Sequence, residues 1–126
     1  DKTAASSWDG FEQFCRERRM AAVAVVTCVG SLRVAALRLA GAEAHTLLEG
    51  PFEIVSLTGT MGAGGGHFHV ALADERGQSV GGHLLAGSLI DTTAEVVLLE
   101  LGGLSFDRQV DPATGYRELI VSRSPD

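Results

Sequence analysis

The chain has 126 residues, of which 45% are hydrophobic and 21% are charged, and its formal net charge is −6. This length and composition suit a single domain over residues 1–126 whose ends, 1–7 and 123–126, are frayed. The acidic charge argues against direct binding of nucleic acid, because phosphate contacts come from clustered lysine and arginine. No apolar run approaches the ~20 residues of a membrane helix, and residues 1–10 lack a signal-peptide pattern. We therefore expect a soluble intracellular protein without a membrane partner, cytoplasmic or, in a eukaryote, nuclear.

The first element expected along the chain is a helix near its start. Asp9 is predicted as the N-cap, with Glu12 three residues on in a capping-box arrangement. Apolar residues then recur at helical spacing until the helix ends near Arg19. Cys15 in this helix and Cys28 beyond it lie among apolar residues and outside any C-x-x-C pair. We expect buried free thiols in a reducing compartment.

The rest of the chain is expected to form β-strands. Residues 20–29 are rich in alanine and valine, which predicts a buried strand that Gly30 and Ser31 end. Residues 92–101 are apolar on both alternating faces, which predicts a central strand or one buried between layers, although their periodicity also fits a helix. The fold class is therefore α/β (α+β), mostly β with one clear helix. The other expected strands are 32–39, 46–48, 52–60, 67–73, 78–85, 104–109 and 116–122, with a glycine-rich loop at 62–66.

One predicted hairpin carries the strongest functional signal. If its loop has three residues, with Gly77 in the left-handed conformation, His69 lies opposite His83. His67 then lies two residues away on the same face, and the apolar residues gather on the other face. A four-residue loop would mix the two faces, and a one-residue slip moves every side chain across the sheet. The pattern therefore favours the first register.

Three imidazoles on one face of one hairpin predict a metal site. Opposed Cβ atoms lie ~5 Å apart and residues i and i+2 ~7 Å apart, so His67, His69 and His83 can reach one ion. Zinc binds imidazole nitrogen at ~2.0–2.1 Å, and three protein ligands with an open position are typical of catalytic sites. Zinc is the favoured divalent ion, although nickel, copper and iron also suit histidine. The alternative is that these histidines are half-buried polar residues that bond to backbone.

Two carboxylates, Glu53 and Glu95, are the candidate catalytic residues. Each lies inside an apolar strand, where a carboxylate must find a donor or take up a proton. Each can serve as a general base or orient a metal-bound histidine. The alternative is a structural hydrogen bond or a contact between subunits. No nucleotide cofactor is expected, because the glycine-rich segment 62–66 is followed by neither a G-K-[ST] motif nor a helix.

Four motifs, in this order along the chain, resemble the PPC domain, the plants-and-prokaryotes-conserved domain. They are P-F-E-I-V-S-L-T-G-T at 51–60, G-H-F-H-V at 66–70, V-G-G-H-L at 80–84 and T-T-A-E-V-V at 92–97. The resemblance extends over nearly the whole chain and implies a compact unit, built on an antiparallel sheet, that assembles as a homotrimer. It also implies the stand-alone prokaryotic type, of which some members carry a metal at the histidines, here His67, His69 and His83.

The resemblance carries no defined reaction. For plant proteins, the resemblance implies that the domain mediates self-association and protein binding, while separate AT-hook motifs contact DNA. The 126 residues contain no R-G-R-P hook, which puts direct DNA binding by this chain in doubt.

Three functions remain, and we favour the first. It is a homotrimeric assembly and interaction module with a three-histidine metal site and protein partners still unknown. The second is a metal-dependent, zinc hydrolase-like enzyme in which the ion activates water and Glu53 or Glu95 is the base. The third is a DNA-associated regulator that acts through a segment not present in these residues.

Overall fold

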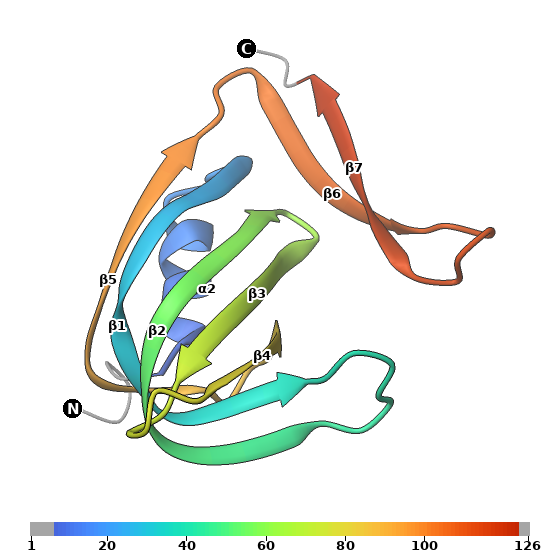
Figure 1. Ribbon diagram of the computed structural model, residues 1–126. Helices are drawn as coiled ribbons and strands as arrows, with labels where there is room; N and C mark the ends of the chain where they lie inside the picture. Colours follow the sequence, from blue (N-terminus) through green and yellow to red (C-terminus); the bar gives the residue numbers. More distant parts are fainter. Residues whose placement is uncertain (1–6, 124–126) are drawn as a thin grey trace.

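The computed structural model describes residues 7–123, which form one helix and seven strands (Figure 1). Every strand pairing is antiparallel, so the expected β-rich fold with one N-terminal helix is confirmed. Within the described range no helix is long and apolar enough to cross a membrane. The elements are α2 (Asp9–Glu17), β1 (Ala22–Arg38), β2 (Thr46–Gly62), β3 (Gly65–Ala73), β4 (Ser79–Leu84), β5 (Leu89–Glu100), β6 (Leu104–Val110) and β7 (Arg117–Arg123).

The ends that we expected to be frayed are in part ordered. Residues 1–6 and 124–126 lie outside the described residues, so that part of the expectation stays a prediction. Ser7, however, forms a β-bridge with Leu89, and Arg123 pairs with Leu104 in the β6–β7 hairpin.

The main sheet bends until it closes on itself. Strand β1 pairs with β2 along one edge, and along the other edge with β5 and then, at Leu37 and Arg38, with β4. Because β2 pairs with β3 and β3 with β4, the four strands β1 to β4 form a closed circuit. The inward side chains are enclosed and form the core. Its largest fully buried members include Val23, Leu32, Leu37, Met61, Phe68 and Leu72.

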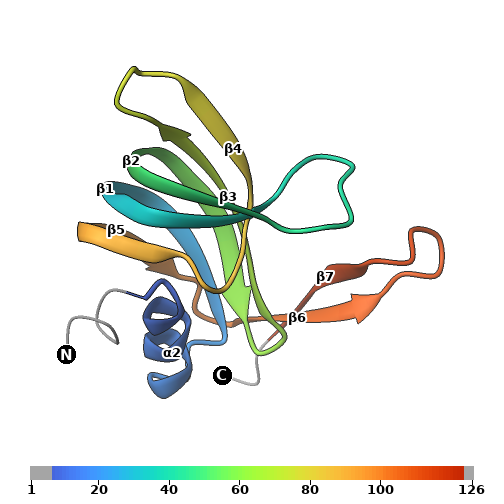
Figure 2. The ribbon, with the colours of Figure 1, turned by 90° about the horizontal axis from the view of Figure 1, so that it is seen from below.

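Helix α2 covers the concave side of the sheet (Figure 2). The rings of Trp8 and Phe11 lie 5.7 Å and 5.4 Å from the ring of Phe68 on β3, both edge to face. Such aromatic contacts stabilise packing beyond the area they bury. Cys15 and Cys28 are free and buried in this core, as expected, and burial raises the pKa of both thiols.

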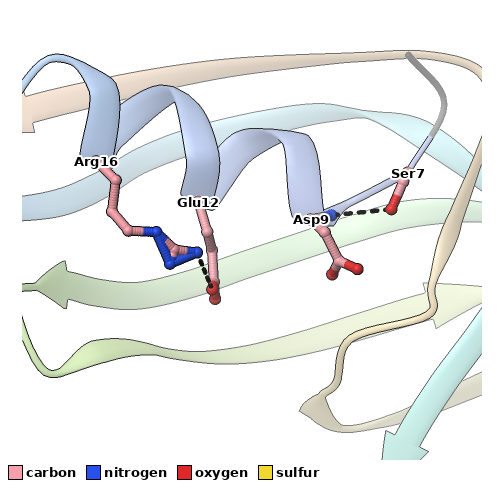
Figure 3. Close-up of polar contacts among 4 residues, drawn as sticks. All are labelled: Ser7, Asp9, Glu12 and Arg16. Carbon is pink, nitrogen blue, oxygen red and sulfur yellow. Dashed lines mark hydrogen bonds and ion pairs between the residues drawn. The ribbon is translucent and has the colours of Figure 1, made fainter. Parts of the chain in front are cut away.

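The start of helix α2 differs from the expected capping box. Trp8 is the N-cap and Asp9 is the first helical residue. The N–H of Asp9 donates to the hydroxyl of Ser7 at 3.2 Å, and Glu12 pairs with Arg16 at 3.6 Å, one turn on (Figure 3). Asp9 as N-cap is therefore wrong by one residue. Tryptophan is not a preferred capping residue, so the sequence pattern pointed to the neighbouring aspartate instead.

Two long strands replace two pairs of expected short ones. Strand β1 runs through Gly30 and Ser31, which we expected to end a strand, and its register against β5 shifts there. A side chain at Gly30 would collide with the backbone of Thr93 on β5. The glycine thus serves close strand packing and not a break. Strand β2 likewise continues through Pro51. The expected glycine loop shrinks to Ala63 and Gly64, because β3 already begins at Gly65.

Segment 92–101 forms strand β5 and not a helix, but its expected central position is wrong. Strand β5 stands at the end of the strand order, where it pairs with β1. Its outward side chains Val97 and Leu99 are 53% and 51% exposed. Val26 and Val29 of the adjacent β1 are 60% and 61% exposed. We call these four residues the β1–β5 patch.

A buried serine ties three segments together. The hydroxyl of Ser88, which is fully buried, accepts the N–H of Ala36 on β1 at 3.0 Å and donates to the carbonyl of Leu85 at 3.1 Å. The backbone carbonyl of Ser88 also accepts the N–H of Trp8 at 3.0 Å. These bonds link β1, the β4–β5 connection and the start of α2.

We expect Ser88→Ala to lower the free energy of unfolding by about 1–3 kcal/mol, because it leaves the buried N–H of Ala36 without a partner. Urea unfolding at a fixed protein concentration measures this loss. Ser79→Ala is the matched control. Ser79 is exposed and donates to the carbonyl of Leu72, so its loss should cost less. Equal losses in the two variants would contradict the role given to Ser88.

Candidate metal centre

The β3–β4 hairpin has the register that the sequence predicts. His69 pairs with His83 and Leu72 pairs with Val80. Gly77 has a φ of +78°, the left-handed conformation that a three-residue loop requires. The carboxylate of Asp74 fixes the loop further, because it accepts the N–H groups of the second and fourth residues after it, at 2.9 Å and 2.8 Å. The local turn therefore sets the register without help from a ligand.

The two faces of the hairpin also divide as predicted. Phe68, Val70 and Leu72 point into the core and are nearly fully buried. His67 and His69, which alternate with them, are exposed on the opposite face, and His83 is partly buried beside them. The alternation of strand side chains thus delivers all three imidazoles to one side of the sheet.

The three imidazoles converge. Their ring centroids lie 4.9 Å (His67 to His83), 5.0 Å (His67 to His69) and 5.8 Å (His69 to His83) apart. One nitrogen from each ring can be chosen so that all lie within 4.8 Å of one another. Nitrogens ~2.1 Å from one tetrahedral ion lie ~3.4 Å apart, so small side-chain rotations bring the three onto one ion.

The donor set fits a divalent metal ion. The Nδ1 atom of His83 is buried and has no hydrogen-bond partner among the described residues. Buried polar atoms without a hydrogen-bond partner are rare in folded proteins and often mark a bound ion or water molecule. A metal ion held by His67, His69 and His83 would supply the missing partner, because imidazole nitrogen is a strong ligand for zinc and its neighbours in the transition series.

The surroundings keep His67 and His83 neutral, which is the form that binds metal. Partial burial, followed by His67 and then Arg38, lowers the pKa of His83 to about 4. Burial, followed by Arg108 and His69, also lowers the pKa of His67. At neutral pH neither imidazole must lose a proton before it coordinates an ion.

This shift predicts a pH dependence for the metal-free protein. Between the ordinary histidine pKa of about 6.5 and the value of about 4 for folded His83, the unfolded chain holds a proton that the folded chain lacks. The free energy of unfolding should therefore fall as the pH drops through this window, by a modest amount because solvent screens the partly exposed site. An NMR titration of the His83 ring checks the cause, and an ordinary pKa there would contradict it.

The histidines lie at the base of a cleft between two projecting hairpins. The far end of the β1–β2 hairpin and the β6–β7 hairpin extend from the body on the same side (Figures 1 and 2). Two adjoining depressions, of about 510 Å³ and about 770 Å³, lie here and share Arg38, His67, His83 and Tyr116. Small molecules can therefore reach the three imidazoles from solvent.

The two candidate catalytic carboxylates lie elsewhere. Glu53 is exposed on β2 and pairs with Ala73, four residues or ~13 Å along β3 from His69. Glu95 is exposed on β5, where it pairs with Val29. Neither lines the two depressions, and both have access to solvent, so neither requires the buried donor that we expected. A catalytic role for either residue stays a prediction.

The sequence did not reveal the basic and aromatic residues around the histidines. Arg38 pairs directly with His83 across β1 and β4, while Arg108 and Tyr116 arrive from the β6–β7 hairpin. These residues are far apart in the chain and belong to no motif. The one signal available was Arg38 itself, a charged residue at the end of a largely apolar strand that also contains Arg33.

Comparison with known proteins gives a consistent result. A family model described as the Plants and Prokaryotes Conserved (PCC) domain matches residues 7–102, which include α2 and β1 to β5. The bifunctional protein GlmU of Synechococcus sp. (strain JA-3-3Ab) is 46% identical over 112 residues, which are 89% of this chain and 18% of that protein. The chain thus spans less than a fifth of the length of this relative.

Two solved structures share the fold over most of the chain. A hypothetical protein from Salmonella enterica is 40% identical with a TM-score of 0.89, covering 92% of this chain and 84% of its own. A metal-containing protein from Archaeoglobus fulgidus is 29% identical with a TM-score of 0.74, covering 89% of this chain and 83% of its own. The closed sheet with one covering helix is therefore a fold that occurs in several microbial proteins.

Proposed function

Since this chain belongs to the Plants and Prokaryotes Conserved (PCC) domain family, also called the PPC domain, we propose that it is a homotrimeric assembly domain. We further propose that each chain binds one zinc ion. The observation that carries the metal site is the convergence of His67, His69 and His83 within 4.8 Å on a hairpin whose register is fixed by its own turn. The likeness to a metal-containing archaeal protein supports it.

Exposed apolar surface supports the assembly. The β1–β5 patch presents four half-exposed or largely exposed aliphatic side chains on one face of the sheet edge. The β6–β7 hairpin adds Val110, Tyr116 and Val121, each more than half exposed. Large exposed apolar side chains that gather on neighbouring strands mark a protein–protein interface, and a homo-oligomer with closed symmetry buries them in every subunit.

We also propose that the protein is intracellular and that this chain does not itself bind DNA. Two free buried cysteines suit a reducing intracellular compartment. The net charge of −6 disfavours direct binding of this chain to DNA.

Elemental analysis and light scattering on one preparation, purified without a nickel column, test the proposal. We expect about one zinc per chain and a solution mass three times the 13.2 kDa of one chain. A chain that stays metal-free after dialysis against zinc would refute the metal site. A monomer at working concentration would refute the assembly, so the two halves fail independently.

A metal-dependent hydrolase is the second candidate, because an open cleft leads to the histidines. Bound zinc would act as a Lewis acid and lower the pKa of a water molecule. The carboxylates that line the cleft are Glu43 and Glu118, which makes them better placed as a base than Glu53 or Glu95. Turnover of ester or phosphoester substrates by zinc-loaded protein, lost in the Glu118→Gln variant, would favour this function.

A further inference from the structure

The cleft wall beside the histidines is basic in a protein that is acidic overall. The depression of about 510 Å³ is lined by Arg38, Arg108 and Arg117, whereas the whole chain has a net charge of −6. The three arginines come from the end of β1, from β6 and from β7. Three separate elements thus bring positive charge to one pocket.

These charges have no carboxylate partner within the described part of the chain. Among residues 7–123, Glu12 and Arg16 form the only ion pair, so none of the three pocket arginines has a carboxylate within 4.0 Å. Glu118 is the single acidic residue that lines this depression. A guanidinium group without a carboxylate partner can bind an external anion, because its planar fork matches carboxylate and phosphate oxygens.

Local packing positions one of these arginines. Arg108, which is partly buried, donates from Nη2 to the hydroxyl of Thr60 on β2 at 3.3 Å. Its backbone lies against the Ala63–Gly64 turn, where a side chain at Gly64 would approach the nitrogen of Arg108 to 2.6 Å. The glycine therefore lets β6 approach the β2–β3 turn, and this approach brings Arg108 to the histidines.

Charge balance at the metal site calls for an anion. Three neutral imidazoles leave a divalent ion with its full charge of +2, and the nearby arginines add to it. A cation in this surrounding is repelled unless negative charge enters with it. Three protein ligands also leave an open coordination position.

We infer that this pocket binds a small molecule through a carboxylate or phosphate group, with Arg38 and Arg108 holding the group next to the three-histidine site. The inference rests on the proposed metal site and names the chemical class of its ligand. The volume of the depression suits a small metabolite. Because the ion and the anion attract each other, each should tighten the binding of the other.

Calorimetry on the whole chain tests this inference, with inorganic phosphate and malonate as the two probes and zinc content measured on every sample. We expect saturable binding of one probe to zinc-loaded protein. The Arg38→Gln/Arg108→Gln variant should weaken it roughly a hundredfold, about tenfold for each guanidinium lost. Arg33→Gln is the matched control, because Arg33 is an exposed arginine on β1 that lines neither depression. The preferred probe identifies the group as phosphate or carboxylate.

The other outcomes overturn one proposal at a time. If zinc is bound but neither probe binds, or if the double variant binds the probe as well as the wild type does, the anion pocket is refuted and the metal site stands. If no zinc is bound but phosphate binding is lost in the double variant, the metal site is refuted and the anion pocket stands. Capture of a duplex of about 20 base pairs, with neither probe bound, would refute a small-molecule ligand in favour of nucleic acid.

Discussion

Replacing His67, His69 and His83 together by alanine is expected to reduce bound zinc from about one ion per chain to less than about a tenth of that. The three imidazoles are the only group of three or more such ligands that the described residues bring within reach of one ion, so no other set can compensate. Elemental analysis after gel filtration measures the loss. His83→Ala alone should have most of this effect, since two ligands hold the ion far more weakly than three.

The control for this experiment is His45→Ala, which removes an exposed histidine in the β1–β2 loop and should leave the zinc content unchanged. Circular dichroism should show that the triple variant stays folded, because Asp74 and Gly77 fix the hairpin register without a metal. Unfolding of the triple variant would show instead that metal-binding energy is used as folding energy. Full zinc retention would refute the site.

Charged substitutions in the β1–β5 patch are expected to dissociate the proposed trimer. Val97→Asp combined with Leu99→Asp replaces two half-exposed aliphatic side chains by carboxylates. Burying an unpaired carboxylate costs several kcal/mol, and a symmetric trimer repeats that cost in every subunit. The solution mass by light scattering should fall from about 40 kDa to the 13.2 kDa of one chain.

The same charge change at an exposed site outside the patch controls for a general loss of solubility. Leu47 on β2 is 69% exposed, so Leu47→Asp should leave the mass of the trimer unchanged. Because the patch residues point away from the core, the double variant should keep its strand content. A trimer that survives both patch substitutions would assign assembly to another surface, and a monomer from Leu47→Asp would show that the patch is not the sole contact.

The sequence predicted the parts of the molecule that depend on neighbouring residues. The β3–β4 register follows from strict alternation and from a glycine in the turn, both of which act within a few residues. The division of the hairpin into an apolar and a histidine face has the same origin. The sequence therefore predicted correctly that His67, His69 and His83 lie together on one face.

Features that depend on distant partners were predicted poorly. Gly30 predicts a strand break from sequence, because the pattern does not show that Thr93, far along the chain, packs against it. The apolar composition of β5 predicts a central strand, although β5 lies at the end of the strand order and its outward side chains are exposed. The arginines of the cleft belong to three separate elements, and they meet because the β6–β7 hairpin lies beside the end of β1.

The long first strand has a consequence for the order in which the chain can fold. Strand β1 is synthesised before β5, yet its outer edge pairs with β5, as Val23 does with Glu100 at the end of that strand. Closing such a long loop has an entropic cost, and proteins dominated by non-local pairs fold slowly. The β3–β4 hairpin joins adjacent segments, so its formation does not require a long loop to close. On the ribosome, the histidine cluster can therefore take shape while β1 still lacks its outer neighbour.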